Sequence, residues 1–138
     1  MPKYLLIVDY RPGVVEAPMD EWKPDEITAH MDYYGKLLKG LEESGELIGQ
    51  EALTGPEFRL EVTGDGVTAP VVTDGPFAEA KEMLAGYSLV DVESEARAVE
   101  IAGLLSAVPG PGGVPLQQPI MVRRVMDAAD FAALDAGR

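Results

Sequence analysis

The sequence contains no cysteine, which excludes disulfides, thiolate catalysis and cysteine-ligated zinc. Basic residues are scarce too: 11 stand against 24 acidic ones, and the net charge is −13. Nucleic-acid binding depends on Lys and Arg that neutralise phosphates, and no basic stripe is present, so direct contact with DNA or RNA is not expected. No apolar run approaches the roughly 18 residues of a membrane-spanning helix, so no membrane association is expected either.

A single histidine sets a further limit, because one histidine without cysteine cannot form a usual zinc site. The glycine-rich turns at residues 64–66 and 110–113 are not followed by the Lys-Ser/Thr pair of a phosphate-binding loop. We therefore expect neither a metal nor a cofactor. The apolar stretch at residues 4–8 is too short for a secretory signal and lacks a cleavage site. Together with the absence of disulfides, this indicates a cytoplasmic protein.

The apolar pattern of the 138 residues is that of one globular domain with strands and helices in turn. Four strands of a sheet are expected at residues 4–8, 46–53, 86–92 and 120–125. A hairpin is expected between the second and third of these, with arms at residues 58–62 and 67–73 around the turn residues 64–66. Pro70 suggests that the second arm is an edge strand.

Two main helices are predicted, one from Pro24 to a stop at Gly45 and one that follows a Ser94 cap. Residues 10–24 and 108–119 are rich in proline and glycine and are expected to be loops. One helical turn is expected at residues 78–83. The domain should end near residue 126, and residues 127–138 should form a short peripheral helix.

The order of these elements is that of a ferredoxin-like βαββαβ fold, of class α+β, with an inserted β-hairpin. Its two helices can cover only one face of the sheet. Residues 4–8 and 120–122 are nonetheless apolar on both faces, so the second face must also be buried. A homodimer that packs sheet against sheet is the favoured solution, because twofold dimers are the commonest closed assemblies. The alternative is that the tail or the hairpin folds across that face.

Residues 74–87, which read Asp-Gly-Pro-Phe-Ala-Glu-Ala-Lys-Glu-Met-Leu-Ala-Gly-Tyr, resemble the signature of the DGPF group of YCII-related proteins. The first strand, the helix that carries His30 and the last strand are also similar, so the resemblance covers residues 3–125. Ala85-Gly86 departs from a commoner Gly-Gly pair, and Tyr87-Ser88 departs from a commoner aromatic pair. The resemblance implies a dimeric α+β barrel.

The wider YCII group carries a His–Asp pair proposed as an active site, and the resemblance points to His30 and Asp74 as catalytic candidates. His30 borders the apolar face of the first helix, and imidazole is the side chain that ordinarily changes its charge near neutral pH. Its structural alternative is a hydrogen bond to a backbone carbonyl. Asp74 would orient the imidazole and favour its charged form. Its alternative is to cap its own turn.

Three further residues are candidate substrate contacts. Lys81 follows the Asp-Gly-Pro-Phe turn and could meet an anionic ligand, although charged residues there more often form a solvated face. Tyr87 could line the cavity that holds this ligand, or it could pack in the core. Asp9 ends the first strand and could reach the same space.

Two functions stay open at this point. The first is a cofactor-independent enzyme that performs acid–base chemistry on a small organic molecule with His30 and Asp74. The second is a non-catalytic module that binds a small molecule or a protein in a stress or regulatory pathway. Many DGPF proteins carry a label of transcription-initiation protein linked to alternative sigma factors. That label rests on genomic association and implies no DNA contact.

Overall fold

The structure is a computed structural model that describes residues 1–9, 13, 17–55, 58–74 and 84–137. Its strands are β1 (Lys3–Asp9), β2 (Leu47–Ala52), β3 (Leu60–Thr63), β4 (Val71–Asp74), β5 (Leu84–Asp91) and β6 (Ile120–Arg124). Its α-helices are α1 (Pro24–Glu43), α2 (Glu95–Ser106) and α3 (Ala128–Ala136), and a 3₁₀ helix, η1 (Met19–Glu21), precedes α1. The predicted helical turn at residues 78–83 lies outside the described residues.

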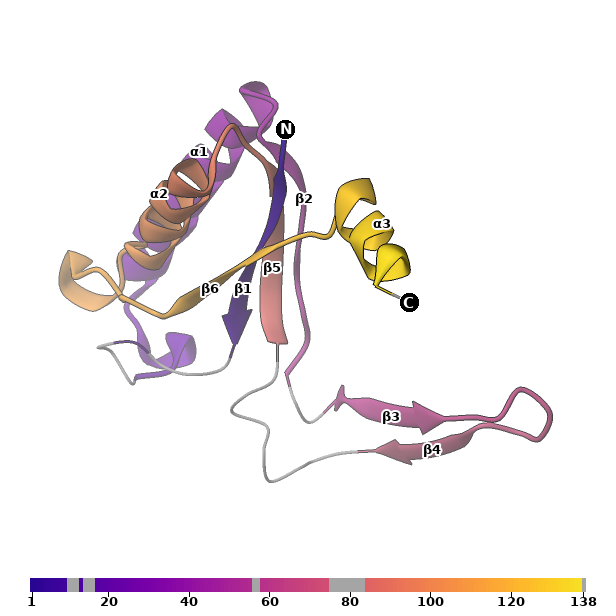
Figure 1. The fold of residues 1–138 in the computed structure, drawn as a ribbon. Helices are drawn as coiled ribbons and strands as arrows, with labels where there is room; N and C mark the ends of the chain where they lie inside the picture. Colours follow the sequence, from indigo (N-terminus) through magenta and orange to yellow (C-terminus); the bar gives the residue numbers. More distant parts are fainter. Residues whose placement is uncertain (10–12, 14–16, 56–57, 75–83, 138) are drawn as a thin grey trace.

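Four strands form the main sheet in the order β2-β5-β1-β6, and every neighbouring pair is antiparallel. Helices α1 and α2 lie together on one face of this sheet (Figure 1). The molecule is thus a mixed α+β protein with antiparallel sheets, and its strand order is compatible with a ferredoxin-like arrangement. The four strands expected for this sheet are all present, within a few residues of their predicted bounds.

The core lies between the main sheet and the two helices. Tyr4 and Leu6 point from β1 into it because side chains alternate along a strand, and Val90 joins them from β5. Helix α2 contributes one apolar stripe of four residues at helical spacing: Ala98, Ile101, Ala102 and Leu105. Ser94, the predicted cap, accepts a hydrogen bond from the amide of Arg97 at 3.2 Å.

The other face of the main sheet is apolar as well, as the sequence predicted from its first strand. Leu5 and Ile7 alternate with the core residues of β1 and are half-buried. Strand register places Leu89 opposite Leu5, and it places both Tyr87 and Met121 opposite Ile7. We call this surface the open face, because α1 and α2 both lie on the opposite side of the sheet (Figure 1).

Strands β3 and β4 pair only with each other and form a two-stranded ribbon. The segment between them runs from residue 64 to residue 70, longer than the predicted turn. Asp65 holds this segment by accepting hydrogen bonds from the amides of Val67 and Thr68. Pro70 has no amide hydrogen to give to a ladder, and β4 begins immediately after it. The second arm is therefore shorter than the sequence pattern suggested.

The C-terminal end of α1 is fixed by its connection to β2. Gly45 has φ +82°, and the amides of Gly45 and Glu46 donate to the carbonyls of Glu42 and Leu41, which is a Schellman motif. Glu46 then receives two hydrogen bonds from the Arg97 guanidinium, at 2.8 and 2.9 Å. These bonds hold the pKa of the Glu46 carboxyl below its ordinary value, and they join the start of β2 to the start of α2.

This bidentate pair gives a first prediction. Replacing Arg97 by Met should lower the free energy of unfolding at pH 7 by about 1 kcal/mol, because a partly buried charge-assisted pair is lost. The pKa of Glu46 is lowered in the folded chain, so the pair contributes fully above the ordinary value of 4.5 and loses its contribution as the pH falls through the lowered value. Urea unfolding of the wild type and the Arg97→Met variant between pH 7 and pH 3 measures this difference in stability and its dependence on pH.

Glu100 provides the control for that comparison, since it also pairs with Arg97 but its side chain is 64% exposed. The Glu100→Gln variant should change the stability much less than Arg97→Met at every pH. An Arg97→Met effect that stays constant from pH 7 to pH 3 would contradict the assignment to Glu46.

Candidate functional site

His30 lies on α1 between two other aromatic side chains. The Trp22 ring meets it edge-on at a centroid distance of 5.4 Å, and the Tyr34 ring stacks at 6.2 Å. Trp22 is 9% exposed, and its indole N–H donates to the carbonyl of Ala17 at 3.0 Å. Burial raises the pKa of the Tyr34 hydroxyl, which therefore stays a neutral group beside the imidazole. The imidazole itself is half-buried.

The Nδ1 atom of His30 lies 3.0 Å from the carbonyl oxygen of Pro109. A carbonyl oxygen can only accept, so Nδ1 must carry the hydrogen of this bond. In the neutral imidazole the other nitrogen, Nε2, then holds a lone pair and can accept a proton. This is the structural role that the sequence left open for His30. Any proton that the neutral imidazole accepts must therefore go to Nε2.

The segment that carries Pro109 is attached to α1 at a second point. Glu26, one helical turn before His30, accepts a hydrogen bond from the amide of Gly112 at 2.6 Å. Its other carboxylate oxygen accepts from the amide of Lys23 at 2.9 Å. The two backbone bonds, with that to Lys23 the stronger influence, hold the pKa of Glu26 below its ordinary value. Glu26 and His30 together clip the loop between α2 and β6 to the first turns of α1.

The same loop meets the end of β1. The Gln118 side chain donates to the backbone carbonyl of Asp9 at 3.0 Å, and Asp9 is only 4% exposed. The chain at Gly13 passes so close that a Cβ atom there would lie 2.0 Å from the carbonyl oxygen of Leu116. The loop thus contacts both α1 and the end of β1. Through it, two of the candidate residues, His30 and Asp9, are connected.

Asp74 lies elsewhere in the chain. It is the last residue of β4, pairs with Leu60 in the ribbon and is exposed. The ribbon projects on the side of the main sheet away from α1 (Figure 1). Among the described residues, His30 and Asp74 share no hydrogen bond, ion pair or ring contact. The structure of one chain does not bring the two together, and their pairing stays a prediction.

The remaining substrate-contact candidates are also separated. Tyr87 is half-buried on the open face, opposite Ile7, whereas α1 and its His30 belong to the covered side of the sheet. Lys81 lies outside the described residues. Among the candidates that the structure describes, Asp9 is the one connected to the His30 surroundings, and that connection runs through Gln118 and the loop.

Sequence reasoning missed the groups that surround His30. Trp22 is the only tryptophan of the chain, but no pattern of residues links it to the histidine. Tyr34, at the i+4 position, fits the apolar stripe of the helix, although this spacing also places its ring beside the imidazole. The Pro109 carbonyl could not be found from residue types, because backbone acceptors carry no sequence signal.

Two negative observations apply to the described part of the chain. No cluster of three or more histidine or acidic side chains there is arranged to hold a metal ion. None of the helices described is both long enough and apolar enough to cross a membrane.

The fold is that of an α+β domain. Its candidate acid–base side chain is His30, which is bonded to the loop after α2. A family model for the YCII-related domain matches residues 2–109. The match spans more than half of the 138 residues, and the chain therefore belongs to the YCII-related family. A search of curated proteins gives no match for it.

The His30–Pro109 bond gives a second prediction. In its neutral form His30 should be the Nδ1–H tautomer, because Pro109 accepts from that nitrogen. The sequence has one histidine, so a long-range ¹H–¹⁵N spectrum shows a single imidazole without assignment. The pyridine-like ¹⁵N signal should belong to Nε2. A spectrum in which Nδ1 is the pyridine-like nitrogen would show that the bond to Pro109 is not made.

Gly13 gives a third prediction. The Gly13→Ala substitution should lower the free energy of unfolding by about 1–3 kcal/mol, because the added methyl group collides with backbone atoms of residues 116–118. The displaced loop should also shift the His30 imidazole signals. Gly35→Ala is the control, since nothing lies within 4 Å of a Cβ there, and it should be neutral or stabilising. Equal stability of Gly13→Ala and wild type would contradict the close approach.

Proposed function

We propose that the protein is a YCII-related protein of the DGPF group that acts as a homodimer, a dimeric α+β barrel, in the cytoplasm. The assignment to the DGPF group rests on the resemblance of residues 74–87 to the signature of that group. The proposed domain is residues 1–126, a ferredoxin-like fold into which the β3–β4 ribbon is inserted, and residues 127–138 form a peripheral tail. The apolar open face supports the dimer, since a second sheet would bury it.

We further propose that His30 performs cofactor-independent acid–base chemistry on a small organic molecule. The observation that carries this proposal is the hydrogen bond from Nδ1 to the Pro109 carbonyl. A histidine that serves as a base commonly has its second nitrogen fixed in this manner, which sets both the tautomer and the ring orientation. Trp22 and Tyr34 restrict the ring further, so Nε2 is presented in a defined direction.

Asp74 keeps its proposed role as the carboxylate partner of this chemistry. Within one chain the ribbon and α1 lie on opposite sides of the main sheet. We therefore propose that Asp74 of one copy reaches the His30 imidazole of a second copy. Tyr87 would line the space between two facing sheets, and Lys81 and Asp9 remain the proposed polar contacts to the ligand. No direct nucleic-acid contact is part of the proposal, in keeping with the net charge of −13.

The fourth prediction tests the chemistry on pools of candidate substrates. A base that removes a proton next to a carbonyl also exchanges that proton with solvent. Pools of small oxo acids, enols and lactones incubated with the protein in D₂O should therefore yield at least one compound that gains deuterium, detected by mass spectrometry. In the His30→Gln variant, the rate of deuterium uptake should fall by about 10²-fold or more. Its amide can still donate to Pro109, but it has no basic nitrogen.

Tyr33→Phe is the matched control, because Tyr33 also donates from α1 to a backbone carbonyl, that of Leu104 at 2.7 Å. It should retain the deuterium uptake. If His30→Gln and wild type exchange at equal rates, the acid–base proposal is wrong. If a compound binds and changes the Trp22 fluorescence but no proton exchanges, the result favours the other function, a non-catalytic binding module in a sigma-factor-linked regulatory or stress pathway.

A further inference from the structure

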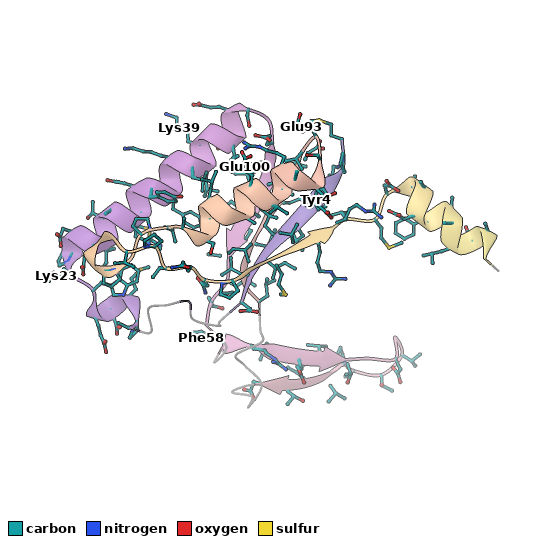
Figure 2. The ribbon with its side chains drawn as sticks, turned by 60° about the vertical axis from the view of Figure 1, so that its left-hand side comes forward. Tyr4, Lys23, Lys39, Phe58, Glu93 and Glu100 are labelled. Atoms are coloured by element: carbon teal, nitrogen blue, oxygen red, sulfur yellow. The ribbon has the colours of Figure 1, made fainter. Side chains whose placement is uncertain are left out.

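The open face of the main sheet is bounded by two projecting elements. The β3–β4 ribbon leaves from one end of the strands, and α3 leaves from the other (Figure 1). Figure 2 shows both elements on the side away from α1 and α2, with Phe58 at the base of the ribbon. Each carries exposed apolar side chains, among them Leu60, Val62 and Val72 on one face of the ribbon, and Phe131 and Leu134 on α3. An isolated two-stranded ribbon is only marginally stable in water, so this side of the molecule is suited to covering by another body.

The floor between these elements is apolar in the middle and charged at its two edges, and the opposed Lys3 and Asp91 lie at one end of its central strands. Its central strands β5 and β1 present Tyr87, Leu89, Leu5 and Ile7. At one edge, β2 places Glu51 opposite Tyr87. At the other edge, β6 places Arg123 opposite Leu5. Among the described residues neither Glu51 nor Arg123 has an ion-pair partner, and both side chains are exposed.

Two ways of placing a second copy on this floor, with its strands aligned to those of the first, satisfy twofold symmetry. With the axis along the strands, β2 of one copy faces β6 of the other, and Glu51 of each copy approaches Arg123 of its partner. With the axis across the strands, each edge faces its own equivalent, which brings acid toward acid and base toward base. Like charges placed opposite each other oppose association, so the charges select the first arrangement.

The dimensions of the first arrangement suit the pair. Glu51 lies level with Ile7 and Arg123 level with Leu5, two residues away along the strands, which is about 7 Å. Facing sheets lie about 10 Å apart, and their edges approach more closely when the two sheets close into a barrel. The long side chains of Glu and Arg span such an offset.

We propose that the open face is a self-association surface on which Glu51 of one copy forms an ion pair with Arg123 of the other, so that the β2 edge meets the β6 edge. This inference rests on the homodimer of the proposed function and adds its orientation. The two equivalent ion pairs select one of two possible dimers, because the apolar floor is compatible with both.

The test is a charge exchange followed by sedimentation velocity over a range of micromolar concentrations. Glu51→Arg places Arg opposite Arg in both pairs of the dimer, and Arg123→Glu places Glu opposite Glu. Each variant alone should dimerise at least about tenfold more weakly than wild type. An equimolar mixture of the two should form a heterodimer of near wild-type affinity, because both of its pairs again join an acid to a base.

Two controls make the same changes of charge on the helix side of the molecule. Glu93→Arg and Lys39→Glu replace exposed residues that Figure 2 shows beside α1 and α2, and both should leave the dimer unchanged. Circular dichroism establishes that every variant is folded. A wild-type monomer throughout the range would overturn the dimer itself. A wild-type dimer whose single variants dimerise normally, or whose mixture fails to recover, would overturn the Glu51–Arg123 pairing and leave the dimer standing.

Discussion

The rest of the structure depends on the burial of β1 between β5 and β6. This strand is apolar on both faces, and its pairing with both neighbours places it in the middle of the main sheet. Tyr4 and Leu6 take up the face that α1 and α2 cover, and the core is built on them. The same alternation leaves Leu5 and Ile7 on the open face. Neither α1 nor α2 covers that face, and this is the basis of the proposed association with a second copy.

The candidate site is a consequence of how α1 begins. Pro24 starts the helix, and its first two turns present Glu26 and His30 on one side, one turn apart. Both bind backbone groups of the loop after α2, so the two helices and the end of β1 are tied together at one end of the sheet. The bond to Pro109 fixes the tautomer of the imidazole and leaves Nε2 for the proposed acid–base role.

The sequence predicted the strands of the main sheet, both core helices, the Ser94 cap and the apolar second face, because each depends on local periodicity and local capping. It placed the ribbon less well, since Pro70 and the bonds of Asp65 shorten the second arm. Of the site, it identified His30 but not the groups around it. The Pro109 carbonyl is a backbone atom 79 positions away, and no pattern of residue types reports such a contact. The Asp74 partner came from family resemblance, and the chain in isolation does not bring it to His30.

The acidic character of the protein makes the few basic side chains informative. Arg59, Arg97 and Arg124 each pair with a carboxylate of the same chain, and Arg97 and Arg124 join separate elements in doing so. Among the arginines that the structure describes, Arg123 differs from these three in having no ion pair with a carboxylate. Arg123 stands at the edge of an apolar floor whose other edge carries Glu51. Apolar burial is non-directional and would allow either orientation of a second copy. The charges distinguish the two orientations of the second copy, because one acid and one base lie at opposite edges of the floor.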